Sequence, residues 1–209
     1  MTTKQITTVN ADEQIKQLYQ TAFPEEERIP WDDLLRLIGE MGLDFTAYYE
    51  ESDFVGFTIV YPRPSYSWFW YFAVREDLRG KGYGQQILTL LVGKYRGQSL
   101  VMDIESTRQE SAENREVRQR RHAFYLRNGF QETQLFRGWS GIEYTILMRG
   151  TGTFTMQDWD DVVAELRQYW TWEKKNQLTH RERPARQFAL VKRRKQNLEK
   201  SITSQNIKL

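Results

Sequence analysis

The sequence predicts one mixed α/β (α+β) domain with a central, mostly antiparallel sheet. Most strand-like segments come in neighbouring pairs joined by short turns, which is typical of antiparallel hairpins. One central helical crossover is expected, in place of a regular series of βαβ units. The expected element order is therefore β-α-α-β-β-β-α-β-α-β-β, and the sequence contains no internal repeat.

The N-terminal part predicts a short strand and two amphipathic helices. Residues 4–9 are strand-like, and Asn10 is expected to cap the next helix. A second helix should open at Pro30 and close at Gly39 and Gly42. The apolar face of the first helix consists of Ile15, Leu18, Tyr19, Ala22 and Phe23.

The middle of the chain predicts a hairpin followed by an aromatic strand. Residues 44–50 and 54–61 are strand-like and are joined by a tight turn. In the next strand, residues 66–74, strict alternation would place Phe69 and Tyr71 on the same face. Both faces of this strand are apolar, which predicts a central strand covered on both sides.

The predicted crossover begins at a glycine-dense loop. A helix is expected from about Gly82 to Tyr95, ended by Gly97, with a strand at 99–104. Because this helix joins strands 66–74 and 99–104, the two strands should be parallel.

The C-terminal part predicts a basic helix over residues 115–128, then a hairpin of residues 130–137 and 142–149, then a final helix. Thr155 and Asp158 have the spacing of a capping pair. The inward face of the final helix comprises Trp159, Val162, Val163, Leu166 and Trp170.

Composition excludes several functional classes. The 209 residues include no cysteine, which excludes disulfides and thiolate chemistry. With only His122 and His180 as further ligands, no structural zinc or other metal site is expected. No run approaches the ~18 apolar residues of a membrane span, and the polar N-terminus lacks a signal-peptide core. A cytoplasmic location is the resulting expectation.

The net charge of +2 is unevenly distributed. Residues 173–209 contain 11 Lys and Arg against 3 Asp and Glu, a net of +8, which leaves −6 for residues 1–172. This basic tail could be helical or flexible. It could bind nucleic acid, an anionic membrane surface or an acidic partner, or pack on the acidic body of its own or a second copy.

The segment RGKGYG at residues 79–84 predicts a binding site for a phosphate-bearing ligand. Its glycines allow close backbone approach, and the first N–H groups of the following helix favour an anion. A P-loop is rejected because Lys81 is followed by Gly82 and not by Ser or Thr. In a dinucleotide fingerprint the last glycine would come one position later, although Asp103 lies where a ribose-binding acid is expected. A glycine turn without a ligand is the remaining alternative.

The loop also matches the pattern R-x-x-G-x-G, and two further segments occur in matching order: FAV at 72–74 and FYLRNGF at 124–130. In these features residues 1–150 resemble the GCN5-related N-acetyltransferase (GNAT) superfamily. The resemblance implies a GNAT-like sheet of about seven strands, with helices on both faces and a splayed parallel pair at the cofactor site. A helix at 151–172 would pack on this domain, and the basic tail 173–209 lies outside the family pattern.

The resemblance implies acetyl-coenzyme A as acetyl donor and no metal. The loop amides would bind the pyrophosphate, and the end of the aromatic strand would pair with the pantetheine arm as a peptide would. Asn114, which precedes the basic helix, could contact the cofactor or, as the residue type favours, cap the helix. The candidate cofactor-binding residues are Phe72, Ala73, Val74, Arg79, Gly80, Lys81, Gly82, Tyr83, Gly84 and Asn114.

Two residues are candidates for proton transfer. Tyr125 matches the tyrosine that protonates the departing sulfur in many members of the superfamily; the alternative is a core aromatic. Glu105 follows strand 99–104 and could accept the amine proton directly or through water. A solvated or acceptor-binding carboxylate is the alternative for Glu105.

The acceptor site is expected near the acidic loop at residues 25–27, between the two N-terminal helices. Glu26 and Glu27 would attract a cationic amine there, whereas a solvated loop is the alternative. The arginines of the basic helix, including Arg118 and Arg121, are expected on a solvated surface, and His122 without a partner.

The sequence therefore predicts an N-acetyltransferase that transfers an acetyl group from acetyl-CoA to a primary amine, by direct attack in a ternary complex. The acceptor would be a small molecule or a peptide. The alternative is a catalytically idle GNAT-fold module that binds acetyl-CoA and binds nucleic acid or an acidic partner through the tail. A homodimer through the aromatics of residues 159–172 is a further option.

Overall fold

The computed structural model describes residues 1–110, 112–139 and 141–169, so the predicted basic tail lies outside the described residues. The elements follow the order expected from the sequence. The strands are β1 (Thr2–Gln5), β2 (Asp44–Glu50), β3 (Asp53–Pro62), β4 (Ser67–Val74), β5 (Leu100–Glu105), β6 (Gln131–Trp139) and β7 (Ile142–Arg149). The helices are α1 (Glu13–Ala22), α2 (Trp31–Met41), α3 (Tyr83–Lys94), α4 (Arg115–Arg127) and α5 (Met156–Tyr169), with short 3-10 helices η1 (Glu25–Glu27) and η2 (Glu76–Leu78).

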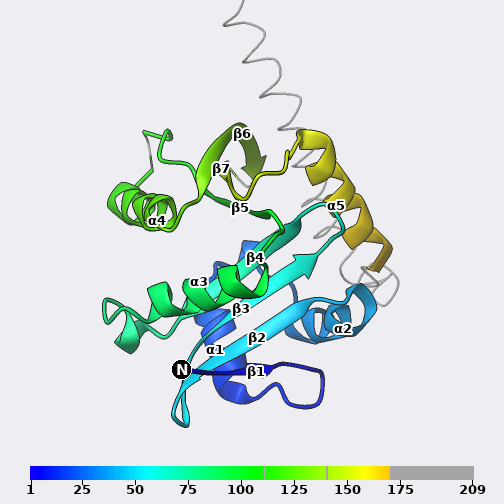
Figure 1. Cartoon of the computed structure of the whole chain (residues 1–209), viewed down its shortest axis with the longest axis vertical. Helices are drawn as coiled ribbons and strands as arrows, with labels where there is room; N and C mark the ends of the chain where they lie inside the picture. The colour runs from blue at the N-terminus through cyan, green and yellow to red at the C-terminus, as the bar shows by residue number, and fades with distance from the viewer. Residues whose placement is uncertain (111, 140, 170–209) are drawn as a thin grey trace, which may run out of the picture.

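All strands belong to one seven-stranded sheet with the order β1-β2-β3-β4-β5-β7-β6. Every neighbouring pair is antiparallel except β4 and β5, which are joined through α3 and run parallel. This confirms the predicted mixed fold with a central crossover. In Figure 1 strands β1 to β4 form one block and β5 to β7 diverge from it.

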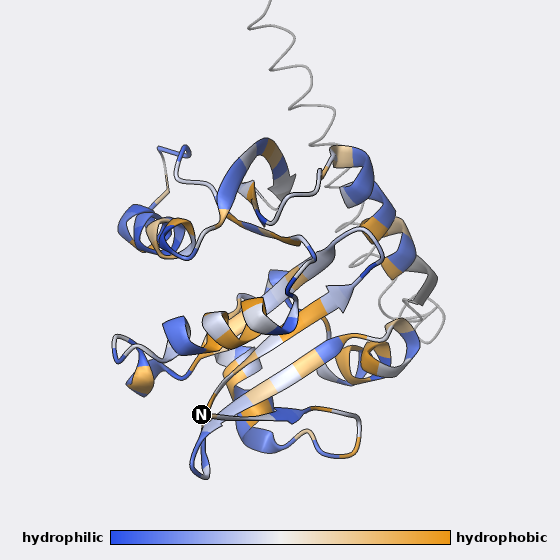
Figure 2. Cartoon of the chain, in the orientation of Figure 1, coloured by the Kyte–Doolittle hydropathy of each residue, from blue (hydrophilic) through white to orange (hydrophobic). Residues whose placement is uncertain are grey.

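Helices cover both faces of the sheet. On one face, residues of α1, α2 and α5 share a buried cluster that includes Ile15, Leu34 and Val162. On the other face, α3 and α4 contribute to a second cluster with Leu88 and Tyr125. In Figure 2 the hydrophobic colour gathers on the central strands and the helices beside them, whereas the β2–β3 turn is hydrophilic. Among the described helices, none combines the length and apolarity needed to cross a membrane.

A β-bulge in β4 makes the predicted strict alternation wrong. The β3–β4 register passes from Ile59 opposite Tyr71 to Val60 opposite Phe69, so one extra residue of β4 lies between these pairs. Tyr71 consequently packs in the cluster of α1, α2 and α5, whereas Phe69 packs in that of α3 and α4. An inserted residue shifts every later side chain to the opposite face, which a sequence pattern with two apolar faces cannot reveal.

The N-terminal strand and helix cap also differ from the prediction. The strand expected at 4–9 is β1 at Thr2–Gln5, and Asp12, not Asn10, caps α1 by accepting a hydrogen bond from Ile15 N (3.1 Å). The side chain of Asn10 closes the intervening turn instead, accepting from the backbone N of Thr7 (2.7 Å). Both residue types cap helices well, so composition alone did not distinguish them.

The ends of α2 and α5 test two further predictions. Gly39 lies inside α2, and the helix ends at Gly42, which has a left-handed φ of 66°. Thr155 and Asp158 form the predicted capping pair: Asp158 Oδ2 accepts from Thr155 N (2.7 Å), and Thr155 Oγ1 accepts from Asp158 N (3.3 Å). Trp159 is buried in the core, so it offers no exposed surface for the dimer suggested above.

Candidate active site

The parallel pairing between β4 and β5 stops after two residue pairs. Ser67 lies opposite Leu100 and Trp68 opposite Val101, and no later pair is formed. Beyond this point β4 stays paired with β3 as far as Val74, while β5 stays paired with β7. The C-terminal half of β4 therefore has a sheet partner on one edge only, which confirms the predicted splayed strand pair.

The glycine-rich loop lies between this open half of β4 and α3. Gly80 and Gly82 have φ values of 78° and 84°, a left-handed conformation that only glycine adopts at no steric cost. A Cβ at either position would meet no atom within 4 Å, so the loop leaves open space around its backbone. Gly82 is the N-cap residue of α3 without a side-chain cap, so the first N–H groups of α3 can face an anion.

The same loop is fixed to both of its neighbours. The Nε of Arg79 donates a hydrogen bond to the carbonyl of Val74 (3.2 Å), which ties the loop to the end of β4. A Cβ at Gly84 would lie 3.7 Å from the Phe124 ring and 3.8 Å from the Phe72 ring. Strand β4, the loop, α3 and α4 thus meet at one place.

Tyr125 of α4 lies on the α3 side of the sheet. Its side chain is buried and its ring lies 5.5 Å from the ring of Phe130. Within the described part of the chain its hydroxyl has no hydrogen-bond partner. Burial raises the pKa of Tyr125 above its ordinary value, an effect that the positive charge of Arg121 opposes in part. The phenol is therefore protonated at neutral pH, as a proton donor must be.

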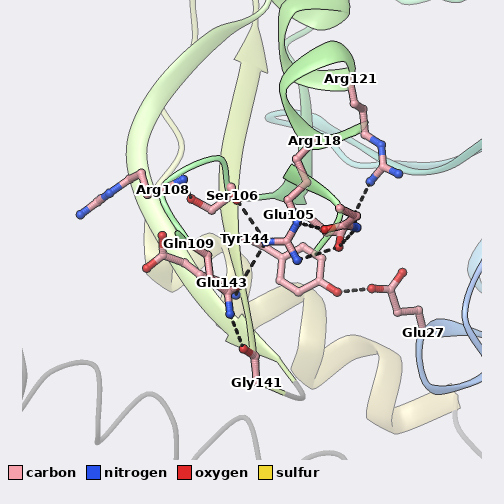
Figure 3. A network of polar contacts seen from close by, with 11 residues as sticks. Glu27, Glu105, Ser106, Arg108, Gln109, Arg118, Arg121, Gly141, Glu143 and Tyr144 are labelled. Atoms are coloured by element: carbon pink, nitrogen blue, oxygen red, sulfur yellow. Dashed lines mark hydrogen bonds and ion pairs between the residues drawn. The ribbon is translucent and has the colours of Figure 1, made fainter. Parts of the chain in front are cut away.

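Glu105, at the end of β5, is held by the first turns of α4 (Figure 3). Its Oε1 accepts from Asn114 Nδ2 (3.0 Å) and lies 3.0 Å from Arg118 Nη2; its Oε2 lies 3.0 Å from Arg121 Nη1. Asn114 is the N-cap residue by position, but its side chain makes no capping hydrogen bond, so the predicted cap is wrong. Its Nδ2 is engaged by Glu105 and its Oδ1 by Arg118 Nε (2.6 Å).

Arg118 is 4% exposed, so the prediction of a wholly solvated arginine surface on α4 is wrong at this position. Its Nη1 also donates to the carbonyl of Ser106 (3.2 Å) and to Gln109 Oε1 (3.0 Å), as Figure 3 shows. Arg118 and Tyr125 are seven residues apart, which places them on one face of a helix. That spacing was the signal that could have identified a buried arginine.

Glu27 comes from η1, in the α1–α2 connection, and contacts both halves of the sheet. Its carbonyl accepts a hydrogen bond from the Tyr71 hydroxyl of β4 (2.7 Å), and its Oε1 accepts one from the Tyr144 hydroxyl of β7 (Figure 3). Burial raises the pKa of Glu27. The Tyr144 hydrogen bond opposes this rise, and the negative charges of Asp103 and Glu105 add to it. Tyr71 and Tyr144 were not among the predicted site residues.

Asp103 is held by a residue that the sequence did not single out. Its Oδ2 accepts from Arg137 Nε (2.6 Å) and Nη2. The Arg137 guanidinium lies 4.2 Å from the centre of the Tyr144 ring and 4.6 Å from that of Trp159. This ion pair with β6 leaves the ribose-binding role considered for Asp103 without support.

His122 also has a partner, contrary to expectation, because its Nε2 lies 2.6 Å from Glu132 Oε1. The side chain therefore connects α4 to β6. Over the described residues, no group of three or more His, Asp and Glu side chains is arranged to hold a metal ion.

Comparison with known protein families gives a match to part of the chain. The model of the acetyltransferase (GNAT) domain matches residues 42–132, which include the β4–loop–α3 unit and α4. No curated protein matches the sequence.

Solved structures of GNAT proteins share the fold. A GNAT-family protein from Bacteroides thetaiotaomicron superposes with a TM-score of 0.64 at 21% identity, covering 79% of this chain and 96% of its own. The ribosomal-protein-S18-alanine N-acetyltransferase from Escherichia coli gives 0.55 at 18% identity, with coverages of 74% and 96%. An aminoglycoside 6'-N-acetyltransferase complexed with coenzyme A gives 0.55 at 15% identity, with coverages of 71% and 96%. Residues 42–132 therefore match the acetyltransferase (GNAT) domain, and the chain shares its fold with solved acetyltransferases of that kind.

Proposed function

We propose that this protein transfers an acetyl group from acetyl-CoA to a primary amine of a small molecule or peptide. One observation carries the proposal: the edge of β4 left open beyond Trp68 leads directly into the glycine-rich loop at the start of α3. An extended backbone edge followed by an anion site suits a ligand with an amide-bearing arm and a pyrophosphate.

The loop would hold the pyrophosphate. Gly80 and Gly82 have open space where a Cβ would stand, and α3 presents uncapped N–H groups. Lys81 adds a positive charge within the same loop. The residues proposed to surround the pyrophosphate are Arg79, Gly80, Lys81, Gly82, Tyr83 and Gly84.

The open edge of β4 would hold the pantetheine arm through the main chain of Phe72, Ala73 and Val74. These residues pair with β3 on one side, and none of the described strands pairs with their other side. A thioester in this position would lie between β4 and β5, within reach of side chains from both faces of the sheet. The solved aminoglycoside 6'-N-acetyltransferase, which shares the fold, has coenzyme A bound.

Tyr125 would protonate the departing thiolate. Its phenol is buried on the α3 side of the sheet and its raised pKa keeps it protonated. Glu105 remains a proposed site residue, but its contacts favour a different part in the reaction from the one predicted. With both oxygens engaged by Asn114, Arg118 and Arg121, it holds α4 and thereby Tyr125 in place. The contacts of Asn114 likewise favour this anchoring role over cofactor binding.

The acceptor amine would approach from the α1–α2 side, where Glu26 and Glu27 lie on η1. A carboxylate there favours a cationic amine. Two proteins that share the fold are named as N-acetyltransferases of an alanine and of an aminoglycoside, both amine acceptors. Direct attack of the amine on the thioester in a ternary complex requires no cysteine, and the chain has none.

The test is thiol release from acetyl-CoA with a panel of primary amines: spermidine, kanamycin, lysine and a peptide with an N-terminal alanine. Release should require one class of amine, and Tyr125→Phe should lower kcat about 100-fold with unchanged coenzyme A binding. Binding of coenzyme A without thiol release on any amine would instead favour the idle module. Stabilisation by NAD and not by acetyl-CoA would overturn the coenzyme assignment.

A further inference from the structure

On the basis of the proposed function, we infer that Glu27 is the residue that accepts the proton of the acceptor amine, and that Tyr144 positions it. Three features of Glu27 point to this role: its contacts with both halves of the sheet, the free oxygen of its carboxylate, and the ion pairs that occupy Asp103 and Glu105.

Glu27 bridges the two halves of the sheet on the side opposite Tyr125. Its main chain is bonded to Tyr71, which belongs to the part of β4 that has lost its pairing with β5. Its side chain is bonded to Tyr144, which lies directly opposite Glu105 in the β5–β7 register. A residue bonded to both halves stands beside the opening between them. An amine that reaches the thioester from the α1–α2 side must pass this carboxylate.

One oxygen of the Glu27 carboxylate is available. Tyr144 donates to Oε1, and no donor among the described residues bonds to Oε2. A fully buried Oε2 would then be a buried oxygen without a hydrogen-bond partner. Glu27 Oε2 is not such an atom, so part of its surface is accessible. Figure 3 shows the carboxylate approaching Tyr144 from the η1 side, separate from the arginines around Glu105. The geometry thus leaves one lone-pair-bearing oxygen for an incoming ammonium group.

The two acids whose charges act on Glu27 are themselves paired with arginines. Asp103 accepts two hydrogen bonds from Arg137, and Glu105 is paired with Arg118 and Arg121. Either carboxylate would have to give up a charge-assisted hydrogen bond before it could accept a proton. Glu27 would not, because its protein partner is a neutral hydroxyl.

The surroundings of Glu27 also suit proton transfer. The groups that face it are Asp103 and Glu105 of β5, Arg137 of β6, Tyr144 of β7 and Tyr71 of β4. Burial and the two negative charges raise the pKa of Glu27, so its carboxylate is a stronger base than an exposed one.

The ammonium gives one proton to Glu27 Oε2, and its nitrogen forms a bond to the acetyl carbon while the carbon–sulfur bond breaks. The nitrogen loses a second proton on forming the amide, and the thiolate takes one proton from Tyr125. Of the two protons lost by nitrogen, one replaces that of Tyr125 and the other leaves Glu27 for solvent.

The first experiment compares Glu27→Gln with wild type from pH 5.5 to 9.5, using the amine that supports thiol release. Glutamine has the same shape and can still accept the Tyr144 hydrogen bond, so the fold is preserved. We expect kcat/KM at pH 7 to fall about 100-fold and the acidic limb of the wild-type profile to disappear, because a general base contributes about 100- to 10,000-fold. The control is Glu13→Gln, on the 80%-exposed side chain of α1, which should match wild type.

A second variant separates proton transfer from shape. Tyr144→Phe removes a hydrogen bond to the ionised carboxylate, which raises the pKa of Glu27 and should move the acidic limb to higher pH. A purely structural role of Tyr144 would lower the rate at every pH without moving the limb, and would overturn its positioning role. An active wild type whose acidic limb survives in Glu27→Gln would overturn the inference alone. No thiol release by wild type on any amine would overturn both the inference and the proposed function.

Discussion

Arg118 Nη2 lies 3.0 Å from Glu105 Oε1 at the junction of β5 and α4, and the two side chains are 5% and 13% exposed. Replacing Arg118 with Met would remove one donor from Glu105, one from Gln109 Oε1 and one from the carbonyl of Ser106. We expect the free energy of unfolding to fall by about 3 kcal/mol, because removing one partner of a buried ion pair leaves the other charge buried and uncompensated.

Urea unfolding measures this loss. The matched control is Arg115→Met, three residues earlier on the exposed side of α4, for which a change within about 0.5 kcal/mol is expected. If both variants unfold at the same urea concentration, the Arg118 contacts contribute nothing to stability.

A pair of glycine substitutions on α3 tests the backbone of the loop. A Cβ at Gly82 or at Gly93 meets no atom within 4 Å, but only Gly82 has a positive φ. Gly82→Ala should therefore lower the free energy of unfolding by about 1 kcal/mol through left-handed strain alone. Gly93→Ala should raise it by about 0.5 kcal/mol, because alanine is the better helix former. Equal effects in chemical unfolding would mean that the left-handed turn is not maintained in solution.

The pKa of Asp44 on β2 should make the free energy of unfolding fall at low pH. Burial raises the pKa of Asp44, but hydrogen bonds from Lys94 (2.5 Å), Tyr95 (2.5 Å) and Thr46 (2.8 Å) outweigh it, and the net shift is downward. A lowered pKa gives stability that is present above the ordinary value of 3.8 and is lost as the pH falls through the folded-state value. Asp44→Asn should be less stable than wild type at pH 7, and the difference should shrink below pH 3.8. A pH-independent difference would contradict this.

The pKa of Glu27 should give the free energy of unfolding the opposite pH dependence. Its pKa is raised by burial, so the folded protein binds that proton more tightly than the unfolded chain does. The resulting stability is present below the ordinary value of 4.5 and is lost as the pH rises through the folded-state value. Glu27→Gln should therefore be more stable than wild type at pH 7, with the advantage fading toward pH 4.5 and below. A variant less stable than wild type at pH 7 would show that the carboxylate is not strained by its surroundings.

The sequence predicted those parts of the fold that depend on local pattern. Hairpin β2–β3, the Thr155–Asp158 pair and the parallel crossover all follow from spacing within a few dozen residues. The bulge in β4 was missed because both faces of the strand are apolar, so a shift of one residue leaves the hydrophobic pattern unchanged.

The loop proposed to bind the coenzyme could be recognised from the sequence, whereas the contacts made by Glu27, itself named as a candidate acceptor-site residue, could not. Arg79 to Gly84 are contiguous, so a single sequence segment identifies the whole loop. Glu27 and Tyr144 are 117 residues apart and meet only because η1 folds against the opening between β4 and β5. The burial of Arg118 depends likewise on Ser106 and Gln109, in the loop that precedes α4, and a helix with four other arginines conceals it.

The two-pair contact between β4 and β5 also bears on the order in which the chain folds. Strands β2 to β4, and β6 with β7, pair with close neighbours in sequence, whereas joining Ser67 to Leu100 requires closure of the whole α3 segment. Trp68, at the end of this contact, is covered by Trp159 of α5, with ring centroids 4.8 Å apart. During synthesis the last described helix is therefore needed to cover the junction, and a chain truncated before α5 would expose a tryptophan where its two β-blocks meet.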